Sequence, residues 1–374
     1  MDLICFKDEV MEVGKEIQKF DFYEWCQVIH EIPLRLVTNQ HRRYMMFKAL
    51  RTLFSVLPFG VFKYKSGSFK TLLLHMVKRV DYDLIYCDHL QLFLYVNMIN
   101  KQKRTSIPIV LQEHNCEYVI VKRSIQTTTS LLKKLFLFIE YQKLQRFEKC
   151  AIEMADRVVI LSKEDRRAMC KLTHKDIDFR MIPIGIEDSS FRKENRPINS
   201  TIKILLMGTW SWEPNRHGLI WFLQTVVPLL ITKKMKFDMD IIGGGIGKDI
   251  LKLSDQYQNV NVKGFVNDID EYFEKCDCLA VPLFIGSGQR MKIIEAFSKE
   301  MPVISTGIGA EGLLYTNNRN ILIANSAEDF LEAFEKIKND ELRVKIIQNA
   351  KQTFDENHSY RIIAKLIAEA VRFE

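Results

Sequence analysis

Residues 280–306 read AVPLFIGSGQRMKIIEAFSKEMPVIST, and this stretch decides the fold. Its apolar start predicts a buried strand that ends at Val281, and its second half predicts an amphipathic helix that begins near Gln289. The loop at 286–288 consists of small residues, which leave backbone N–H groups accessible at the start of the helix. Because these groups and the helix dipole attract negative charge, the loop is a candidate anion site.

Three charged residues follow this loop. Arg290 brings a fork of donors to the first turn of the expected helix, and Lys292 and Glu295 are three apart, which puts them on one helix face. A cation near the loop and a carboxylate one turn further suit a nucleoside diphosphate, with Lys292 at the phosphates and Glu295 at the ribose hydroxyls. An ordinary strand-to-helix turn with a surface Lys–Glu pair fits the spacing equally well.

Outward from this stretch, strand-like and helix-like segments alternate along the chain. Strands are expected at 2–6, 26–31, 84–87, 107–111, 157–161 and 179–182, and then at 202–207, 237–242, 260–262, 278–281, 303–304 and 321–323. Helices are expected between them at 10–18, 40–54, 69–79, 90–100 and within 131–154, and then at 215–231, 250–256, 268–273, 290–299, 327–338, 342–354 and 360–373. Such alternation predicts α/β domains whose parallel sheets are covered on both faces. The expected fold is two Rossmann-like, doubly wound domains that face a cleft.

The expected domain limits follow from the same alternation. The polar segment 188–200 reads as a linker. It separates an N-terminal domain, 1–187, from a C-terminal domain, 201–357, and a last helix within 358–374 closes the chain. The length of 374 residues agrees with two domains of ~150 residues each.

Positive charge is concentrated in the first half. Residues 1–187 hold 30 Lys+Arg against 22 Asp+Glu, a net charge of +8, and the remainder holds 24 against 25, a net charge of −1. A basic surface favours anionic partners such as lipid headgroups. The segment 131–154 interleaves apolar side chains with basic ones, which predicts either a helix on an anionic bilayer surface or a buried helix with a basic outer face. The basic residues are Lys133, Lys134, Lys143, Arg146 and Lys149.

The sequence also argues against several classes of protein. No apolar run reaches the ~18 residues that a membrane span needs, and the N-terminus lacks a signal-peptide pattern. No nucleic-acid-binding module is recognisable. The eight cysteines form no CxxC pair, so they are expected to be reduced thiols. The protein is accordingly expected to be cytoplasmic, and it could also bind peripherally at the inner face of the membrane.

The 280–306 stretch resembles the donor signature of family 4 glycosyltransferases, the retaining enzymes of GT-B fold. Four other segments agree in order and spacing: QEHNCEY at 112–118, FEKCAIEMADRVVILSKED at 147–165, MGTWSWEPNRHGLIWF at 207–222 and GAEGL at 309–313. The resemblance covers nearly the whole chain, and it implies a GT-B glycosyltransferase.

The resemblance also implies roles for the matching residues. His114 would approach the donor sugar, while Arg290 and Lys292 would stabilise the charge of the diphosphate; these three are the expected catalytic residues. No metal and no other cofactor is expected, because the nucleotide sugar is a substrate. Donor binding is expected from Gly208, Phe265, Val266, Ser287, Gly288, Glu295 and Glu311.

Two positions depart from the family pattern. Ser287 stands where members often carry a glutamate that touches the transferred sugar, eight residues before Glu295. Thr209 stands where they often carry an arginine. Neutralisation of the diphosphate would then depend on Arg290 and Lys292, with Arg216 as a weaker candidate.

Three further motifs are weaker. DMD at 238–240 resembles a metal-binding pair of aspartates, but it begins a strand instead of ending one. GGGIG at 243–247 resembles a dinucleotide loop, but no acidic residue ends a strand ~20 residues later, so it is interpreted as a tight turn. His89 ends the strand at 84–87 and is interpreted as structural.

The implied reaction moves a sugar from a UDP-linked donor to a glycan or lipid-linked acceptor in surface polysaccharide synthesis, with retention of the anomeric configuration. Two alternatives stay open: a GT-B sugar-nucleotide epimerase, and a non-catalytic protein that binds a nucleotide sugar. Donor turnover with an acceptor, interconversion without one, and binding alone distinguish the three.

Family members begin with a strand and a glycine-rich loop that precede a strand like 2–6, whereas here Met1 falls directly before that strand. The first strand of a doubly wound sheet is normally central. The sequence therefore predicts a shortened N-terminal sheet with a gap in its ladder, and low stability of that domain.

Overall fold

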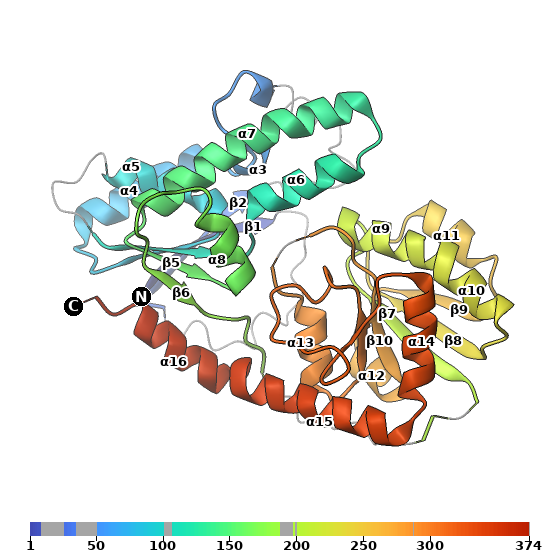
Figure 1. Cartoon of the computed structure of the whole chain (residues 1–374). Helices are drawn as coiled ribbons and strands as arrows, with labels where there is room; N and C mark the ends of the chain where they lie inside the picture. Colours follow the sequence, from blue (N-terminus) through green and yellow to red (C-terminus); the bar gives the residue numbers. More distant parts are fainter. Residues whose placement is uncertain are drawn as a thin grey trace. The chain divides into compact units, whose positions relative to one another are not determined.

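The structure is a computed structural model of the chain, and it describes residues 1–8, 26–34, 51–100, 107–187, 197–198, 200–286 and 288–373. The chain forms two compact units (Figure 1). Unit 1 comprises Met1–Val159, Met169–Arg180 and Phe373–Glu374, and unit 2 comprises Ile160–Ala168 and Met181–Arg372. In the described part of the chain, no helix is long and apolar enough to cross a membrane.

Unit 1 is an α/β unit with two described sheets. β1 (Asp2–Asp8) and β2 (Val28–Leu34) form a parallel pair, and a second sheet has the order β3-β4-β5-β6. The strands of the second sheet are β3 (Ile85–Asp88), β4 (Ile109–Glu113), β5 (Arg157–Ile160) and β6 (Phe179–Met181). Unit 1 also contains the helices α3 (Phe59–Phe62), α4 (Gly67–Arg79), α5 (Phe93–Asn100), α6 (Glu117–Thr127) and α7 (Leu131–Met154), with a 3-10 turn, η3, at Leu90–Leu92.

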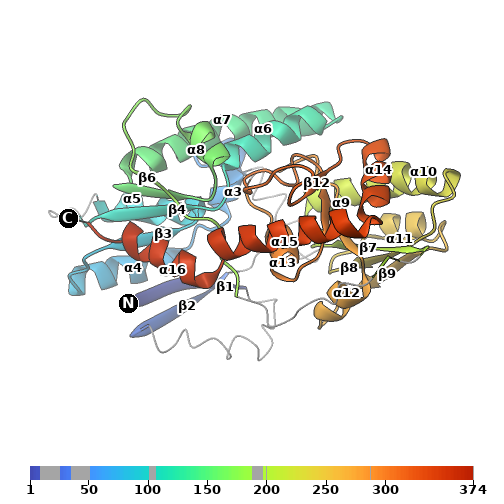
Figure 2. The same ribbon diagram turned by 60° about the horizontal axis from the view of Figure 1, so that its bottom comes forward.

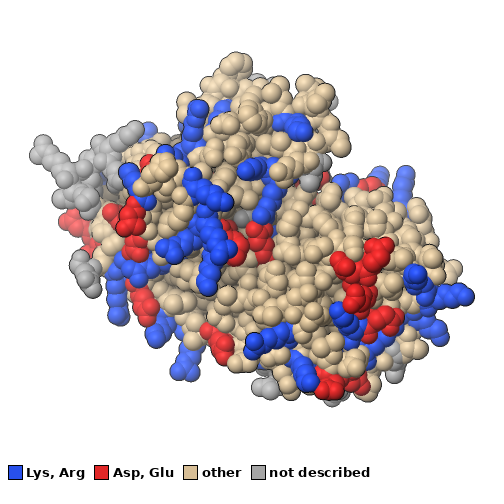
Figure 3. Space-filling view, in the orientation of Figure 1, with Lys and Arg blue, Asp and Glu red and all other residues tan. Residues whose placement is uncertain are grey.

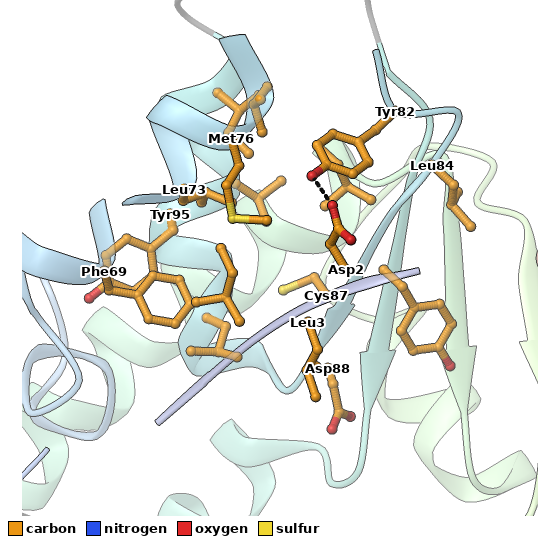
Figure 4. Close-up of a pocket in the computed structure, with 17 residues that line it drawn as sticks. Asp2, Leu3, Phe69, Leu73, Met76, Tyr82, Leu84, Cys87, Asp88 and Tyr95 are labelled. Carbon is orange, nitrogen blue, oxygen red and sulfur yellow. Dashed lines mark hydrogen bonds between the residues drawn. The ribbon is translucent and has the colours of Figure 1, made fainter. Parts of the chain in front are cut away.

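A pocket of about 190 Å³ lies between β1 and β3 (Figure 4). Residues of β1, β3, α4 and α5 line it, and the Tyr82 hydroxyl donates to Asp2 Oδ2 at 2.5 Å at its edge. Among the described strands, no ladder joins β1 to β3. Side-chain packing, such as Phe6 on Phe69 at 4.6 Å between ring centroids, connects β1 to α4.

Unit 2 contains a six-stranded parallel sheet in the order β12-β11-β10-β7-β8-β9. Its strands are β7 (Ile202–Met207), β8 (Phe237–Ile242), β9 (Val260–Gly264), β10 (Cys278–Val281), β11 (Val303–Ser305) and β12 (Leu322–Ile323). The helices are α8 (Lys163–Met169), whose last residue falls in unit 1, α9 (Glu213–Trp221), α10 (Val227–Thr232), α11 (Lys248–Ser254), α12 (Asp270–Lys275), α13 (Met291–Ser298), α14 (Ala327–Ile337), α15 (Asp340–Asn357) and α16 (Tyr360–Ala370).

Side chains of β7 alternate between two hydrophobic clusters because successive residues of a strand point to opposite faces. Ile204 and Leu206 pack with residues of α9, α10 and α14, whereas Leu205 packs with residues of α12, α13 and α15. Figure 2 shows α10 and α14 on one side of the strands and α12 on the other. Unit 2 is therefore the three-layer, doubly wound arrangement that the sequence predicts.

The expected strands are confirmed within a few residues at their ends. The helix expected over 215–231 is interrupted by a π segment, Phe222–Val226 (η4), just before Pro228, which cannot donate a backbone hydrogen bond. The helix α6 was not expected from the sequence. The helix expected at 10–18, most of the one expected at 40–54 and most of the linker at 188–200 lie outside the described residues.

Candidate functional site

Glycine turns follow three adjacent strands at the carboxyl edge of the unit 2 sheet. Gly208 follows β7, Gly243 follows β8, and Gly264 ends β9. Gly243 has φ +118, and a Cβ there would collide with the carbonyl oxygen of Gly208. The backbone N–H of Trp210 donates to Gly244 O at 2.8 Å, which connects the turn after β7 to the one after β8. The segment at 243–247 is thus the tight turn that the sequence predicts. Because Gly243 has no side chain, its backbone lies directly against that of Gly208.

Lys292 lies in the first turn of α13 and reaches under the Gly208 turn. Its Nζ donates to Met207 O at 2.5 Å and to Asn215 Oδ1 at 3.2 Å. A Cβ on Gly208 would lie 3.0 Å from this Nζ, so the glycine makes room for the ammonium group. Burial, and secondly the positive charge of Arg290, lower the pKa of Lys292 to about 7. The amine is thus held close to the end of β7, and at a pH near or above 7 its neutral form can take up a proton when an anion binds.

Arg290 is the N-cap of α13, one residue before the helical turn that the sequence assigns to it. Its side chain is buried, and the guanidinium carbon lies 5.8 Å from the centroid of the Trp212 ring. A Cβ on Gly286, whose φ is +140, would collide with the Arg290 guanidinium. Position 286 must therefore be glycine for the Arg290 side chain to pack against the loop. Gly288 also has a positive φ, of +78. Ser287 lies outside the described residues.

Glu295 lies one turn beyond Lys292 but in a different electrostatic environment. Burial raises the pKa of its carboxyl, Lys299 lowers it, and Asp270 raises it further. Lys299 itself forms an ion pair with Asp270, at the start of α12. Lys292 therefore contacts β7, whereas the charges near Glu295 come from α12 and the end of α13.

The remaining expected donor residues lie in loops after other strands of the same sheet. Phe265 follows Gly264 and is 77% exposed, and Val266 packs partly against the cluster around α12 and α13. Glu311 lies in the turn that follows β11, with its backbone N–H bonded to Ile308 O at 3.3 Å. Arg216, the weaker candidate, pairs with Asp249 on α11.

His114 follows β4 in unit 1, next to Asp88, which ends β3, and His89, which comes after it. Its Nε2 lies 2.5 Å from Asp88 Oδ1, and the centroids of the His114 and His89 rings are 4.0 Å apart. Burial raises the pKa of the Asp88 carboxyl, but the hydrogen bond to His114 and the nearby imidazoles lower it more. The pKa of Asp88 is therefore below its usual value. Burial, and secondly His114, lower the pKa of His89.

Sequence reasoning missed Asn215, Asp88 and the contact of His89 with His114. Asn215 is buried, accepts from Lys292 and donates from Nδ2 to Thr209 O at 3.0 Å. Asp88 is the last residue of β3. Both polar residues flank an expected strand or helix end, and that is the signal by which they could have been found.

Comparison with known proteins agrees with this architecture. Residues 201–340 match the family described as "Glycosyl transferases group 1". A relative from Klebsiella pneumoniae, an uncharacterised 44.6 kDa protein in the cps region, is 24% identical over 330 residues, which are 86% of this chain and 78% of the relative.

Two solved structures have similar folds over nearly their full lengths. Sucrose-phosphate synthase from Thermosynechococcus elongatus matches with a TM-score of 0.68 and 14% identity, over 99% of this chain and 98% of that one. HepE of Anabaena, in complex with UDP and glucose, matches with a TM-score of 0.65 and 13% identity, over 99% and 98%. The chain thus has the GT-B fold of two Rossmann-like domains, and its residues 201–340 are similar to the group 1 glycosyl transferases.

Proposed function

We propose that this protein is a retaining glycosyltransferase that moves a sugar from a UDP-linked donor to a glycan or lipid-linked acceptor in surface polysaccharide synthesis. The observation that carries the proposal is Lys292, a partly buried amine held by Met207 O and Asn215 Oδ1 beside the glycine turn after β7. The family match over 201–340, the UDP in the HepE complex and the cps-region relative support it.

The site would catalyse transfer by stabilising the leaving diphosphate. Lys292 and Arg290 supply positive charge, and the backbone N–H groups at the start of α13 supply aligned dipoles, so negative charge that develops on the phosphate oxygen is stabilised. Glu295 would accept hydrogen bonds from the ribose, Phe265 and Val266 would contact the base, and Gly208, Gly288 and Glu311 would complete the donor site. His114 would act on the donor sugar from unit 1.

Retention without a protein nucleophile requires a front-face reaction. In that route the departing phosphate oxygen takes the proton of the acceptor hydroxyl as the new bond forms. No metal is needed, since the diphosphate charge is balanced by Arg290 and Lys292.

The acceptor side of the proposal includes an anionic membrane surface. At the start of α7, four large apolar side chains are exposed, and Lys133 and Lys134 are exposed between them. In Figure 3 the region that Figure 1 draws as α6 and α7 is mostly tan with isolated blue side chains. Lys143 and Lys149, by contrast, pair with Glu140 and Glu153. The apolar side chains are Leu131, Leu132, Leu135 and Phe138, between 51% and 83% exposed.

An acceptor screen tests the proposed function. The full chain is incubated with radiolabelled UDP-sugars and a panel of glycan and lipid-linked acceptors, and transferred label and free UDP are measured together. Acceptor-dependent release of UDP with labelled product supports the transferase. Interconversion of the UDP-sugar without acceptor identifies an epimerase, and tight donor binding with no turnover identifies a binding protein; both outcomes contradict the proposal.

A further inference from the structure

The carboxyl ends of β3 and β4 bring three potential metal ligands together in unit 1. Asp88 is paired in register with Gln112 in the parallel ladder of these strands. His114 lies two residues beyond Gln112, just after the end of β4, and its Nε2 lies 2.5 Å from Asp88 Oδ1. His89 follows Asp88 directly in the chain.

The ligand atoms of this set are close enough to share one ion. One ligand atom each of Asp88, His89 and His114 lies within 4.8 Å of the other two. Two ligands of a tetrahedral ion, each about 2.1 Å from the metal, are roughly 3.4 Å apart. The Asp88–His114 hydrogen bond of 2.5 Å would thus open by less than 1 Å when an ion replaces the proton.

The backbone of His89 is held in an unusual conformation that keeps its ring at this position. Its φ is 76, in the left-handed region that non-glycine residues rarely adopt. Its N–H donates to Gln112 O at 3.1 Å, and its carbonyl accepts from Leu92 N–H at 3.1 Å. These bonds to β4 and to η3 fix a strained residue, and strained residues of this kind concentrate at ligand sites.

We propose that Asp88, His89 and His114 form a binding site for a divalent transition-metal ion of the Zn²⁺ type. Two imidazoles and one carboxylate are the donor set that such ions prefer over Mg²⁺ or Ca²⁺. The Asp88 side chain is 57% exposed and that of His114 is 29% exposed, so water can complete the coordination sphere.

An occupied site would have a consequence for activity. His114 is also proposed to act on the donor sugar, so an ion on its imidazole would block that role and inhibit transfer. This consequence depends on the proposed function, whereas the binding of the ion does not.

Zn²⁺ binding to the full chain tests the inference without any assay of transfer. A variant with the exposed Cys150 and Cys170 changed to serine serves as the parent, so that thiols do not compete. Titration against a chromophoric zinc chelator should reveal one Zn²⁺ per chain. Asp88→Asn and His89→Gln should each weaken binding at least about tenfold, since each removes a ligand, and His75→Ala, at an exposed histidine on α4, should leave it unchanged.

Co²⁺ gives a second measurement that does not depend on the variants. Bound to the parent, it should show the visible absorption of a four- or five-coordinate ion, which Zn²⁺ displaces. The inference is overturned if the parent binds no Zn²⁺ in the micromolar range. It is equally overturned if folded Asp88→Asn and His89→Gln bind it as the parent does.

Discussion

Lys292 is the residue whose protonation should respond to the donor. In the free protein burial and Arg290 lower its pKa to about 7, so at pH 8 most chains carry it neutral. A diphosphate beside Nζ favours the charged form and raises the pKa again. UDP binding between pH 7 and 8.5 should therefore take up a proton, and UDP affinity should fall as the pH rises through this window.

Calorimetry in buffers of different ionisation enthalpy measures that proton. Lys292→Met should bind UDP more weakly and without the proton uptake, and Lys338→Met, at a surface lysine paired with Glu335, should behave as the wild type. Binding by the wild-type chain with no change in protonation would show that Lys292 does not meet the phosphates.

Glu295 is expected to hold the ribose. Glu295→Ala should weaken UDP binding by ~1–3 kcal/mol, the loss of hydrogen bonds to a charged acceptor. Calorimetry with UDP measures the change, and Glu274→Ala, on the neighbouring α12, is a matched control. A folded Glu295→Ala chain with unchanged UDP affinity would refute the ribose assignment.

His114 should matter for the reaction more than for donor binding. We expect His114→Ala to reduce transfer by about 10²–10³-fold, the usual loss when one group that stabilises the transition state is removed. UDP affinity should change little, and His75→Ala should change neither quantity. A parallel loss of rate and affinity, or no loss of either, would contradict this role.

Spacing along the sequence predicts only those residues of the candidate site that are contiguous, and the others were expected only from the family resemblance. Gly286, Gly288, Arg290 and Lys292 fall in one stretch, so the loop and the helix that follow β10 indicate them together. The bond between Lys292 and Asn215 joins residues 77 apart in the chain. Which polar side chain meets Lys292 depends on the strand order β10-β7, which spacing along one sequence does not determine.

At the scale of elements, burial decides which segments the sequence predicts well. β10 and β5 are buried at every position, and such short apolar runs bounded by polar residues are the clearest strand signal. The helix α6 contains more polar than apolar side chains and follows the mostly polar segment 112–116, so its pattern is weak. Its start is stabilised from outside, because Glu148 on α7 accepts hydrogen bonds from Glu117 N–H and Tyr118 N–H at 3.0 Å.

The β1–β2 pair should be the least stable described part of the sheets. A two-stranded sheet is marginal by itself, and no described ladder extends it. From Asp2 to Lys7, the part of β1 whose burial is described, no residue is fully buried, whereas Ile204 and Leu205 of β7 are completely buried. Amides of β1 and β2 should exchange hydrogen at least about tenfold faster than those of β7 and β8, because local opening costs less free energy there. Hydrogen exchange read by mass spectrometry measures this, and equal protection of the two pairs would contradict it.

At the scale of the whole molecule, charge and apolar surface differ between the two parts of the chain. Residues 1–187 carry a net charge of +8 and the remainder −1. Net charge could be counted from the sequence, but the sequence left open whether the 131–154 helix is buried or lies on a bilayer. The structure separates its two ends: Leu131 and Leu132 are more than 80% exposed, while Leu144 and Ile152 are buried.

The start of α7 should therefore bind anionic membranes. Leu131, Leu135 and Phe138 recur at helical spacing, so they can enter a bilayer together while Lys133 and Lys134 meet the headgroups. Each lysine near an anionic surface contributes about 1 kcal/mol, and salt screens this attraction within ~10 Å at 0.1 M. The chain should sediment with vesicles that contain anionic lipid, much less with neutral ones, and less as salt increases.

Lys133→Gln with Lys134→Gln should remove the preference for anionic lipid, and Leu131→Ser with Leu132→Ser should weaken all binding. Leu251→Ser, at an exposed leucine of α11, should have no effect. Equal sedimentation with neutral and anionic vesicles would rule out the electrostatic part of this prediction, and wild-type binding by the double leucine variant would rule out the apolar part.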